Sequence, residues 1–226
     1  MTDDMKYIYL RNHPLMSSLT EQKLKETATM TKLRTVYRGE VISYGEGGYT
    51  RVHFLVKGKV KITDNSAAES ELIKDILVEP DIFGDLSLEG QLNRYESAEA
   101  LTANTIIVSF HVNDFKRILE DNPLMALNYV RNVNAKLQRL ENRHADLVFL
   151  DTKDRLIRFI KNWARTDGSR MGDKIILNNY LTHSDIAGFI ATSRQSVNML
   201  LNELRTSGML CYNRKHIELN NPIAWN

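Results

Sequence analysis

The stretch that most constrains the fold of this chain is residues 182–210, THSDIAGFIATSRQSVNMLLNELRTSGML. Thr182 and Ser193 stand where helix N-caps are expected, and Gly208 can end the second of two helices. Between these residues the apolar side chains recur at helical spacing in two runs, which comprise Ile186, Phe189, Ile190, Val197, Leu200, Leu201 and Leu204. The stretch therefore predicts two short amphipathic helices joined by a tight turn.

The face of the second predicted helix opposite its leucines is polar and carries Arg194, Gln195, Asn198 and Asn202. Long hydrogen-bond donors of this kind pair with guanine and adenine edges, and they suit the N-terminal end of a helix in the major groove of DNA. The same pattern fits an ordinary helical hairpin whose polar residues only face water. DNA recognition and a solvated surface therefore both remain open on this pattern alone.

The residues that follow Gly208 favour DNA recognition. Their sequence, MLCYNRKHIEL, places a turn-prone segment between two short apolar alternations and predicts a β-hairpin. Arg214 and Lys215 fall at the tip of this hairpin, where basic side chains can contact a phosphate. Residues 151–226 also carry 11 Lys and Arg against 7 Asp and Glu, whereas the whole chain of 226 residues has a net charge of +2.

The composition excludes several classes of protein. Cys211 is the only cysteine, which rules out a disulfide framework and a cysteine-held iron–sulfur or zinc cluster. No stretch approaches the roughly 20 apolar residues of a membrane span, and the N-terminus lacks the apolar core of a signal peptide. The chain also lacks a nucleophile–base pairing, metal-ligand spacing and a phosphate-cradling Gly-Lys-Ser/Thr loop. We therefore expect a cytoplasmic protein without membrane contact, metal site or enzymatic activity.

The N-terminal part of the chain changes from helical to β periodicity. Residues 4–31 are expected to be helical with a break near 18–20, and residues 113–120 and 151–165 predict further helices, the last followed by a loop at 166–173. Between them, short β-prone runs alternate with turns rich in Gly, Asp and Asn, at 35–37, 41–43, 52–56, 59–63, 72–78 and 106–110. Many short strands at close spacing indicate a barrel, sandwich or roll.

The helix predicted at 124–148 has a heptad pattern. Beginning at Ala126, its apolar positions alternate between spacings of 4 and 3, and the residues that follow form the seam of Val130, Val133, Leu137, Leu140, His144 and Leu147. One alternative is a long helix packed on its own domain. The pattern favours a parallel pair across a two-fold axis, which would set two DNA-recognition helices roughly 34 Å apart on successive major grooves.

In this order of parts the chain resembles the CRP/FNR family of bacterial transcription regulators. The motifs that carry the resemblance are Phe83-Gly84-Asp85-Leu86, Phe149-Leu150-Asp151 and Ser193-Arg194-Gln195-Ser196-Val197. The resemblance implies an α+β fold with an N-terminal antiparallel, jelly-roll-like β-roll and flanking helices at 1–122, a dimerisation helix and hinge at 123–150, and a winged helix-turn-helix at 151–226. It also implies a homodimer that binds double-stranded DNA at a pseudo-palindromic operator and contacts RNA polymerase.

For an effector pocket the resemblance carries over unevenly. In the branch that binds cyclic AMP, a Gly-Glu-Leu stretch holds the ribose and an Arg-Ser-Ala stretch holds the phosphate. In this chain Gly84-Asp85-Leu86, followed by Ser87, matches the Gly-Glu-Leu stretch. The Arg-Ser-Ala stretch is matched only by Ser97-Ala98.

Three of the expected contacts are absent or altered, namely those of the phosphate-binding arginine and of the Thr-Ser pair that reaches the adenine. Glu96 replaces the phosphate-binding arginine, and a carboxylate would repel a phosphodiester. Arg94 is offset by two positions, roughly 7 Å along a strand. Leu140-Glu141 replaces the Thr-Ser pair that reaches the adenine. We therefore predict that cyclic AMP is not the effector, and both an unidentified small ligand and no ligand remain open.

Haem is the remaining sensing chemistry to weigh. An axial ligand could come from His53, His111 or His144, but a lone histidine in an apolar pattern is more often structural. The residues therefore do not identify a cofactor.

For DNA the resemblance assigns Arg194 to guanine and places Thr182, His183, Ser193 and Ser196 near phosphates. Gln195 replaces a common glutamate and Met199 a common arginine, so the operator is expected to differ from the best-known consensus. Two hypotheses remain. The chain is a DNA-binding regulator, or it is a ligand-binding or protein-interaction module of the same fold that no longer binds DNA.

Overall fold

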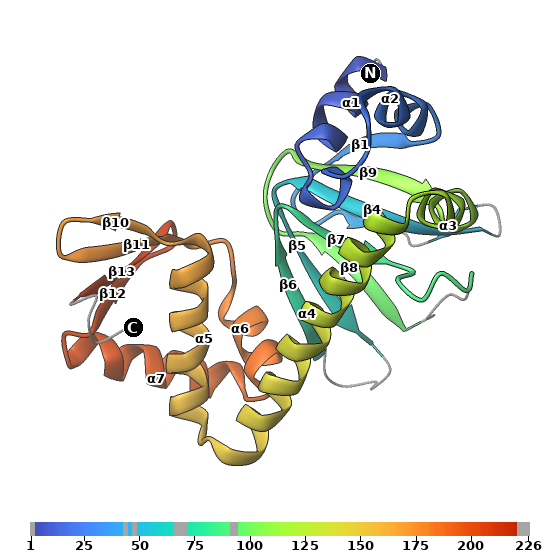
Figure 1. Cartoon of the computed structure of the whole chain (residues 1–226). Helices are drawn as coiled ribbons and strands as arrows, with labels where there is room; N and C mark the ends of the chain where they lie inside the picture. Colours follow the sequence, from blue (N-terminus) through green and yellow to red (C-terminus); the bar gives the residue numbers. More distant parts are fainter. Residues whose placement is uncertain (1–2, 43–44, 47–48, 66–71, 91–94, 221–226) are drawn as a thin grey trace. The chain divides into compact units, whose positions relative to one another are not determined.

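The computed structural model describes residues 3–42, 45–46, 49–65, 72–90 and 95–220. The chain divides into two compact units, one of Met1–Ala68 with Lys74–Leu140 and one of Glu69–Ile73 with Glu141–Asn226. Most of the helices and strands of both units are labelled in Figure 1. No helix in the described part of the chain is long and apolar enough to cross a membrane.

The first unit begins with helices, as the sequence predicts. They are α1 (Asp3–Arg11), a single 3-10 turn η1 (Pro14–Met16) and α2 (Glu21–Thr29). Thr20 caps α2, because its hydroxyl accepts a hydrogen bond of 3.3 Å from the backbone N–H of Lys23. The predicted break near residues 18–20 is therefore confirmed.

Two antiparallel sheets form a roll behind these helices. One has the order β1 (Lys32–Val36), β9 (Thr105–His111), β4 (Tyr49–Lys57) and β3 (Gly45–Glu46), and β7 (Asp81–Gly84) also pairs with β4. The other has the order β2 (Val41–Ile42), β8 (Glu96–Ala100), β5 (Lys59–Asp64) and β6 (Leu72–Val78). One apolar cluster between them includes Val36, Leu55, Ile62, Phe83 and Ile107, all buried. The predicted roll is confirmed.

The sequence patterns missed three strands of this roll, which are the two-residue β3 and the longer β7 and β8. Strand β7 has only four residues and no alternation, because its first three residues are all buried. Strand β8, Glu-Ser-Ala-Glu-Ala, alternates polar residues with alanine instead of β-branched residues, so it lacks the usual composition of a strand. Both are held by antiparallel pairing with longer strands, β4 and β5. Their pairing, and not their own propensity, makes them strands.

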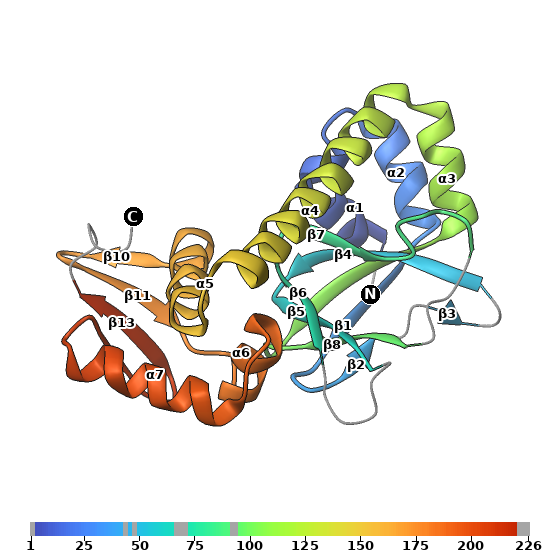
Figure 2. The ribbon, with the colours of Figure 1, turned by 90° about the horizontal axis from the view of Figure 1, so that it is seen from below.

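Two further helices complete the first unit. They are α3 (Val112–Asp121) and α4 (Pro123–Phe149), and Figure 2 shows them with α1 and α2 on one side of the roll. An aromatic cluster lies beneath them, in which Phe115 of α3 contacts Phe54, Phe110 and Tyr129 at centroid distances of 5.6, 5.5 and 5.5 Å. This buried cluster joins the N-terminal half of α4 to the sheet.

Among the residues that the structure describes, the second unit contains the end of α4, three whole helices and a four-stranded sheet. The helices are α5 (Thr152–Asp167), α6 (His183–Ile190) and α7 (Arg194–Thr206), and the two short predicted helices are confirmed as α6 and α7. The antiparallel sheet has the order β10 (Ser169–Met171), β11 (Lys174–Asn178), β13 (His216–Asn220) and β12 (Leu210–Tyr212). The predicted hairpin after Gly208 is confirmed as β12 and β13, which we call the wing together with their turn.

The predicted loop at 166–173 is wrong in part. Helix α5 continues through Asp167, and β10 occupies Ser169–Met171 before a turn at Gly172, whose φ is +60°. All three residues of β10 are exposed, so the strand carries no apolar alternation that the sequence could reveal. It exists because it pairs with β11.

Candidate functional site

Helices α6 and α7 begin at the residues that their sequence predicts. The hydroxyl of Thr182 accepts from the N–H of Asp185 at 3.0 Å, and the Asp185 carboxylate accepts from the N–H of Thr182 at 2.8 Å. Ser193 caps α7 in the same way, through a 3.0 Å bond from the N–H of Ser196. Between the helices Ala191 adopts a left-handed conformation with φ of +52°, which makes the turn tight. The caps fix where the exposed face of α7 begins.

The apolar residues of both helices form the core behind that face. Ile186, Ile190, Val197, Leu201 and Leu204 are almost wholly buried. Since Val197, Leu201 and Leu204 occupy one side of α7, the opposite side of this helix is exposed to solvent. There the structure places Arg194, Gln195 and Asn198, all exposed, with Ser196 half-buried at the edge. The three predicted base-contacting residues therefore share one free surface.

The turn of the wing presents two basic side chains. Arg214 and Lys215 are exposed between β12 and β13. The side-chain oxygen of Asn213 accepts from the N–H groups of Lys215 and His216 at 2.7 and 3.0 Å, which orders the turn. Asn179 reinforces it by donating to the carbonyl of Asn213 at 2.9 Å. The basic tip therefore has a defined backbone.

Tyr212 joins the wing to both helices and was not found by sequence reasoning. Its hydroxyl donates to the side-chain oxygen of Asn202 on α7 at 3.3 Å. Its ring meets the ring of His183, the first residue of α6, edge-on at 5.8 Å, and the guanidinium of Arg205 lies 5.6 Å from its centre. No sequence pattern signals this role, because a tyrosine in a short strand is ordinary. These contacts hold α6, α7 and the wing as one surface.

His183 has an altered protonation equilibrium. Its partial burial, followed by the positive charge of Arg194, lowers the pKa of His183 below its usual value of 6.5. The lowered pKa favours the uncharged imidazole at neutral pH, and one of the two nitrogens of that form can donate a hydrogen bond. A phosphate oxygen is a suitable acceptor for that N–H.

Arg155, on the first turn of α5, is a second residue that the sequence analysis missed. Its Nε donates to the carbonyl of Ile190 at 2.9 Å, and its Nη2 to that of Ala191 at 3.3 Å. Its Nη1 donates to the carbonyl of Leu150 at 2.9 Å. One guanidinium thus satisfies carbonyls at the end of α6 and in the Phe149-Leu150-Asp151 segment. No local pattern signals this role, because Arg155 and Ile190 are 35 positions apart.

Gly84 and Asp85 form the centre of a compact loop after β7. The buried carboxylate of Asp85 accepts from the hydroxyls of Thr50 and Ser87 at 2.8 and 2.7 Å, and from the N–H of Gly90 at 2.9 Å. Gly84 has a φ of +98°, and a Cβ there would stand 2.4 Å from the carbonyl oxygen of Arg51. The carboxylate predicted to hold an effector therefore holds its own loop.

The next residue of this loop is bound to α4. The carbonyl of Leu86 accepts a hydrogen bond of 2.5 Å from the hydroxyl of Tyr129. Burial, with the nearby charge of Asp85, raises the pKa of Tyr129, so the hydroxyl stays protonated and remains a donor. Sequence reasoning missed Tyr129, because its position in the helix indicates only burial.

The second predicted part of the pocket lies on β8, in the other sheet. Glu96 forms an ion pair with Lys74 of β6, Ser97 shares a 2.8 Å hydrogen bond with Thr63, and Ala98 is fully buried. Arg94 lies outside the described residues. Leu140 and Glu141 are exposed on α4. The structure thus brings Gly84, Asp85, Leu86 and Ser87 together in one loop and places Ser97 and Ala98 on a strand of the other sheet.

Two of the three histidines that could ligate haem have other partners. His53 is buried, shares a 2.7 Å hydrogen bond with Ser109 and stacks on Phe83. His111 lies 3.4 Å from the guanidinium of Arg51, and His144 is exposed on α4. Among the residues that the structure describes, no group of three or more His, Cys, Asp and Glu side chains could hold a metal ion.

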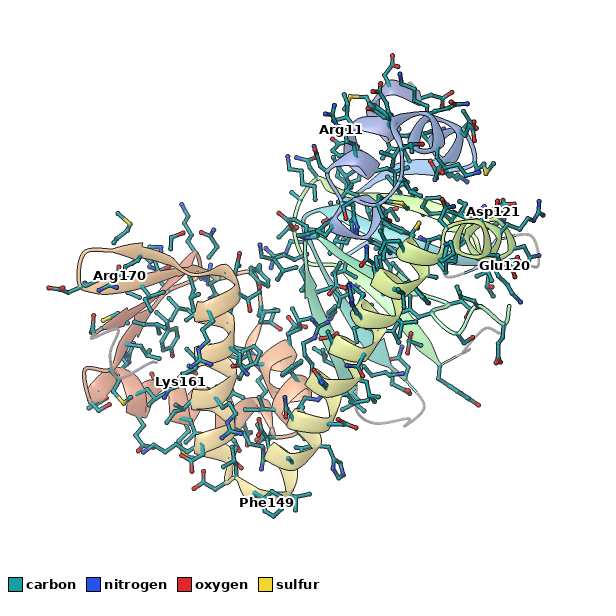
Figure 3. The ribbon with its side chains drawn as sticks, viewed as in Figure 1. Arg11, Glu120, Asp121, Phe149, Lys161 and Arg170 are labelled. Carbon is teal, nitrogen blue, oxygen red and sulfur yellow. The ribbon has the colours of Figure 1, made fainter. Side chains whose placement is uncertain are left out.

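The seam on α4 is largely exposed in a single chain. Leu137 and Leu140 have relative exposures of 51% and 52%, and Val130, His144 and Leu147 are exposed as well. Val133 differs, because it is half-buried and packs against the core of its own unit. The seam ends near Phe149, which Figure 3 labels at the end of α4 and which is 81% exposed.

Ion pairs fix the orientation of this helix on the roll. Lys136 lies 2.6 Å and Arg139 3.3 Å from the carboxylate of Asp81, a buried residue at the start of β7. Beside these ion pairs Leu137 and Leu140 stay exposed to solvent. An exposed apolar stripe of this length is typical of a surface that a partner covers.

Comparison with known proteins assigns both parts of the chain. Residues 33–122 match the cyclic nucleotide-binding domain, and residues 154–224 match the Crp-like helix-turn-helix domain. The chain is 30% identical over 189 residues to the global nitrogen regulator of Synechococcus elongatus, covering 83% of this chain and 85% of the relative. It is 28% identical over 170 residues to the CRP-like cAMP-activated global transcriptional regulator of Mycobacterium tuberculosis, covering 75% of each.

A solved structure agrees with these matches in fold. The transcriptional regulator TTHA1359 of Thermus thermophilus, of the CRP/FNR family, has a TM-score of 0.68 at 21% identity, over 86% of this chain and 96% of that one. The match to the global nitrogen regulator is long enough to include residues of both domains. The chain therefore belongs to the CRP/FNR family of transcription regulators.

Proposed function

We propose that this protein regulates transcription as a homodimer that binds a pseudo-palindromic site in duplex DNA through α7 and the wing. The observation that carries the proposal is the surface that Tyr212 holds together. On it the exposed donors Arg194, Gln195 and Asn198 stand beside a basic wing tip. A helix that presents such donors at its N-terminal end fits the major groove.

Within this surface the residues have two roles. Arg194 suits the O6 and N7 atoms of guanine, and Gln195 and Asn198 suit the N6 and N7 atoms of adenine. Thr182, His183, Ser193 and Ser196 lie at the first turns of α6 and α7, where side chains and N–H groups can hold phosphates. Arg214 and Lys215 at the wing tip add positive charge for the same purpose.

Dimerisation through the seam on α4 supplies the symmetry of the proposed site. The apolar side chains of Val130, Leu137, Leu140 and Leu147 are already presented to solvent, so pairing needs no rearrangement of the helix. A two-fold axis along α4 would repeat the DNA-binding surface once per half-site. We assign 1–122 to sensing, 123–150 to dimerisation and 151–226 to DNA binding.

The effector of the roll, where one acts, is not cyclic AMP in this proposal. The Asp85 carboxylate already accepts two hydrogen bonds from its own loop and one from Thr50 of β4. Glu96 is negatively charged and paired with Lys74, so it cannot serve as a phosphate-binding arginine. Contact with RNA polymerase and a cytoplasmic location complete the proposal by analogy with the family.

Selection of bound sequences from random duplex DNA tests the proposed function. We expect enrichment of one pseudo-palindrome, whose affinity falls steeply with salt because phosphate contacts release counterions. The variant Arg117→Ala removes one positive charge from α3, outside the proposed DNA-binding surface. It should leave the affinity for DNA unchanged. The absence of enrichment, with no binding at low salt, would favour a module of this fold that does not bind DNA.

A further inference from the structure

Met199 interrupts the polar face of α7 with a large apolar side chain. It has a relative exposure of 63%, one of the highest among the large hydrophobic residues of the described chain. It follows Gln195 by four residues and precedes Asn202 by three, so these three side chains are neighbours on one helix face. The buried residues Leu200 and Leu201 of the same turn already fill the core. Met199 therefore lies on the DNA-binding surface and outside the core.

The chemistry of a thioether limits what Met199 can recognise. It has no hydrogen-bond donor and is only a weak acceptor, so it cannot replace an arginine or a glutamine at a base edge. It is flexible and polarizable, and it gains free energy when apolar atoms cover it. In the major groove of B-DNA the apolar group that bases display is the C5-methyl group of thymine.

We propose that Met199 recognises the C5-methyl group of a thymine, at the base pair contacted by Gln195 or at its neighbour. This inference rests on the proposed binding of α7 in the major groove and adds a specificity-determining residue to it. Gln195 would select adenine by two hydrogen bonds, while Met199 would select thymine by apolar contact alone. The pair together predicts an A/T-rich segment in each half-site.

The expected size of the effect follows from the burial of one methyl group. Such burial changes affinity by about fourfold for one half-site and by roughly fifteenfold for two. Because the contact is apolar, this factor should be independent of salt, unlike the contribution of the phosphate contacts.

Uracil substitution tests the proposal directly, because uracil differs from thymine only by the methyl group. Each symmetric pair of thymines in the selected operator is replaced by uracil, and the dissociation constant is measured for the unaltered protein, Met199→Ala and Met199→Leu. Met171→Ala is the matched control, because Met171 is a 67% exposed methionine of the same unit that lies on β10.

We expect one symmetric pair of thymines at which replacement by uracil raises the dissociation constant roughly fifteenfold, both for the unaltered protein and for the Met171→Ala variant. For Met199→Ala, the replacement of these thymines by uracil should hardly change the dissociation constant. For Met199→Leu, it should still cause most of the increase. Coupling between side chain and methyl group is what identifies their contact.

Two results would overturn the inference. If uracil has the same effect on Met199→Ala as on the unaltered protein at every position, Met199 does not contact a thymine methyl, while the proposed DNA binding stands. If no variant and no unaltered protein binds the operator at low salt, the proposed function fails together with the inference.

Discussion

The guanidinium Nε of Arg155 lies 2.9 Å from the carbonyl oxygen of Ile190, the last residue of α6. The same side chain binds the carbonyl of Leu150, which follows the last residue of α4. The segment between α4 and α5 is thus connected to the turn that precedes α7 through one side chain. This connection is local to the second unit, and it links the hinge segment to the DNA-binding surface.

Arg155→Met is expected to lower the free energy of unfolding by about 2 kcal/mol, because hydrogen bonds from a charged donor to half-buried carbonyls are lost. Arg155→Lys should recover only part of this, because an ammonium lacks the planar fork that reaches several carbonyls. Urea-induced unfolding measures both. Arg165→Met removes an exposed arginine from the same helix and serves as the control. Equal stabilities of the Arg155→Met and Arg165→Met variants would show that the contacts of Arg155 contribute nothing.

Replacing Leu137 and Leu140 together by aspartate is expected to give a monomer. In a single chain both side chains are exposed, so the substitutions should leave the fold of the unit intact. In the dimer the aspartates would be buried without partners, at a cost of several kcal/mol. Analytical ultracentrifugation at micromolar concentration measures the change, with Tyr37→Asp, an exposed apolar residue of the roll, as the control. A double variant that stays wholly dimeric excludes α4 as the main interface.

Cyclic AMP is expected to bind weakly or not at all. Glu96 and its ion pair with Lys74 stand where a phosphate would need a cation, and Asp85 is already hydrogen-bonded within its loop. Isothermal titration with millimolar cyclic AMP should therefore show no saturable heat. A dissociation constant in the micromolar range would mean that a cation from outside the described residues, such as Arg94, reaches the phosphate.

His13 is expected to make the stability of the first unit depend on pH. Burial lowers the pKa of His13 to about 4. The hydrogen bond to the carbonyl of Asp81 raises this pKa, but by less than burial lowers it. Between pH 6.5 and 4 the unfolded chain therefore binds a proton that the folded chain does not, so stability falls as the pH falls through this range. The full loss is on the order of 3 kcal/mol.

The comparison that isolates this contribution is between the unaltered protein and His13→Gln. The free energy of unfolding of the unaltered protein minus that of His13→Gln should fall as the pH is lowered from about 7 to about 4.5. A difference that is constant over this pH range would show that His13 titrates alike in both states.

The sequence predicts well those features that depend on local patterns. Thr182, Ser193 and the apolar residues between them define α6 and α7 by capping and periodicity alone. The exposed seam around Leu137 and Leu140 follows from the heptad spacing. These features could be predicted because each depends on residues within a few turns of one another.

What the sequence could not predict depends on distant contacts. Strand β8 forms only because β5 and β2 pair with it, and its own residues favour no strand. The role of Tyr129 needs the carbonyl of Leu86, which is 43 positions away, and the role of Tyr212 needs its placement next to α7. The sequence could not show that the Asp85 carboxylate is hydrogen-bonded to Thr50 either, because these residues are 35 positions apart.

The central claim is that Arg194 contacts bases whereas Lys215 contacts phosphates. Two single variants test this claim most directly. Arg194→Ala and Lys215→Ala are compared on the selected operator and on scrambled duplex DNA, each at two salt concentrations. Arg194→Ala should lose about 1 to 3 kcal/mol per half-site on the operator and flatten the preference at one symmetric pair of positions.

Lys215→Ala should instead weaken both DNAs about equally and make the salt slope shallower by roughly 0.9 per lost phosphate contact, twice that for the dimer. If Arg194→Ala loses affinity equally on operator and scrambled DNA, Arg194 is a backbone contact, and the assignment of α7 as the helix that recognises bases is contradicted.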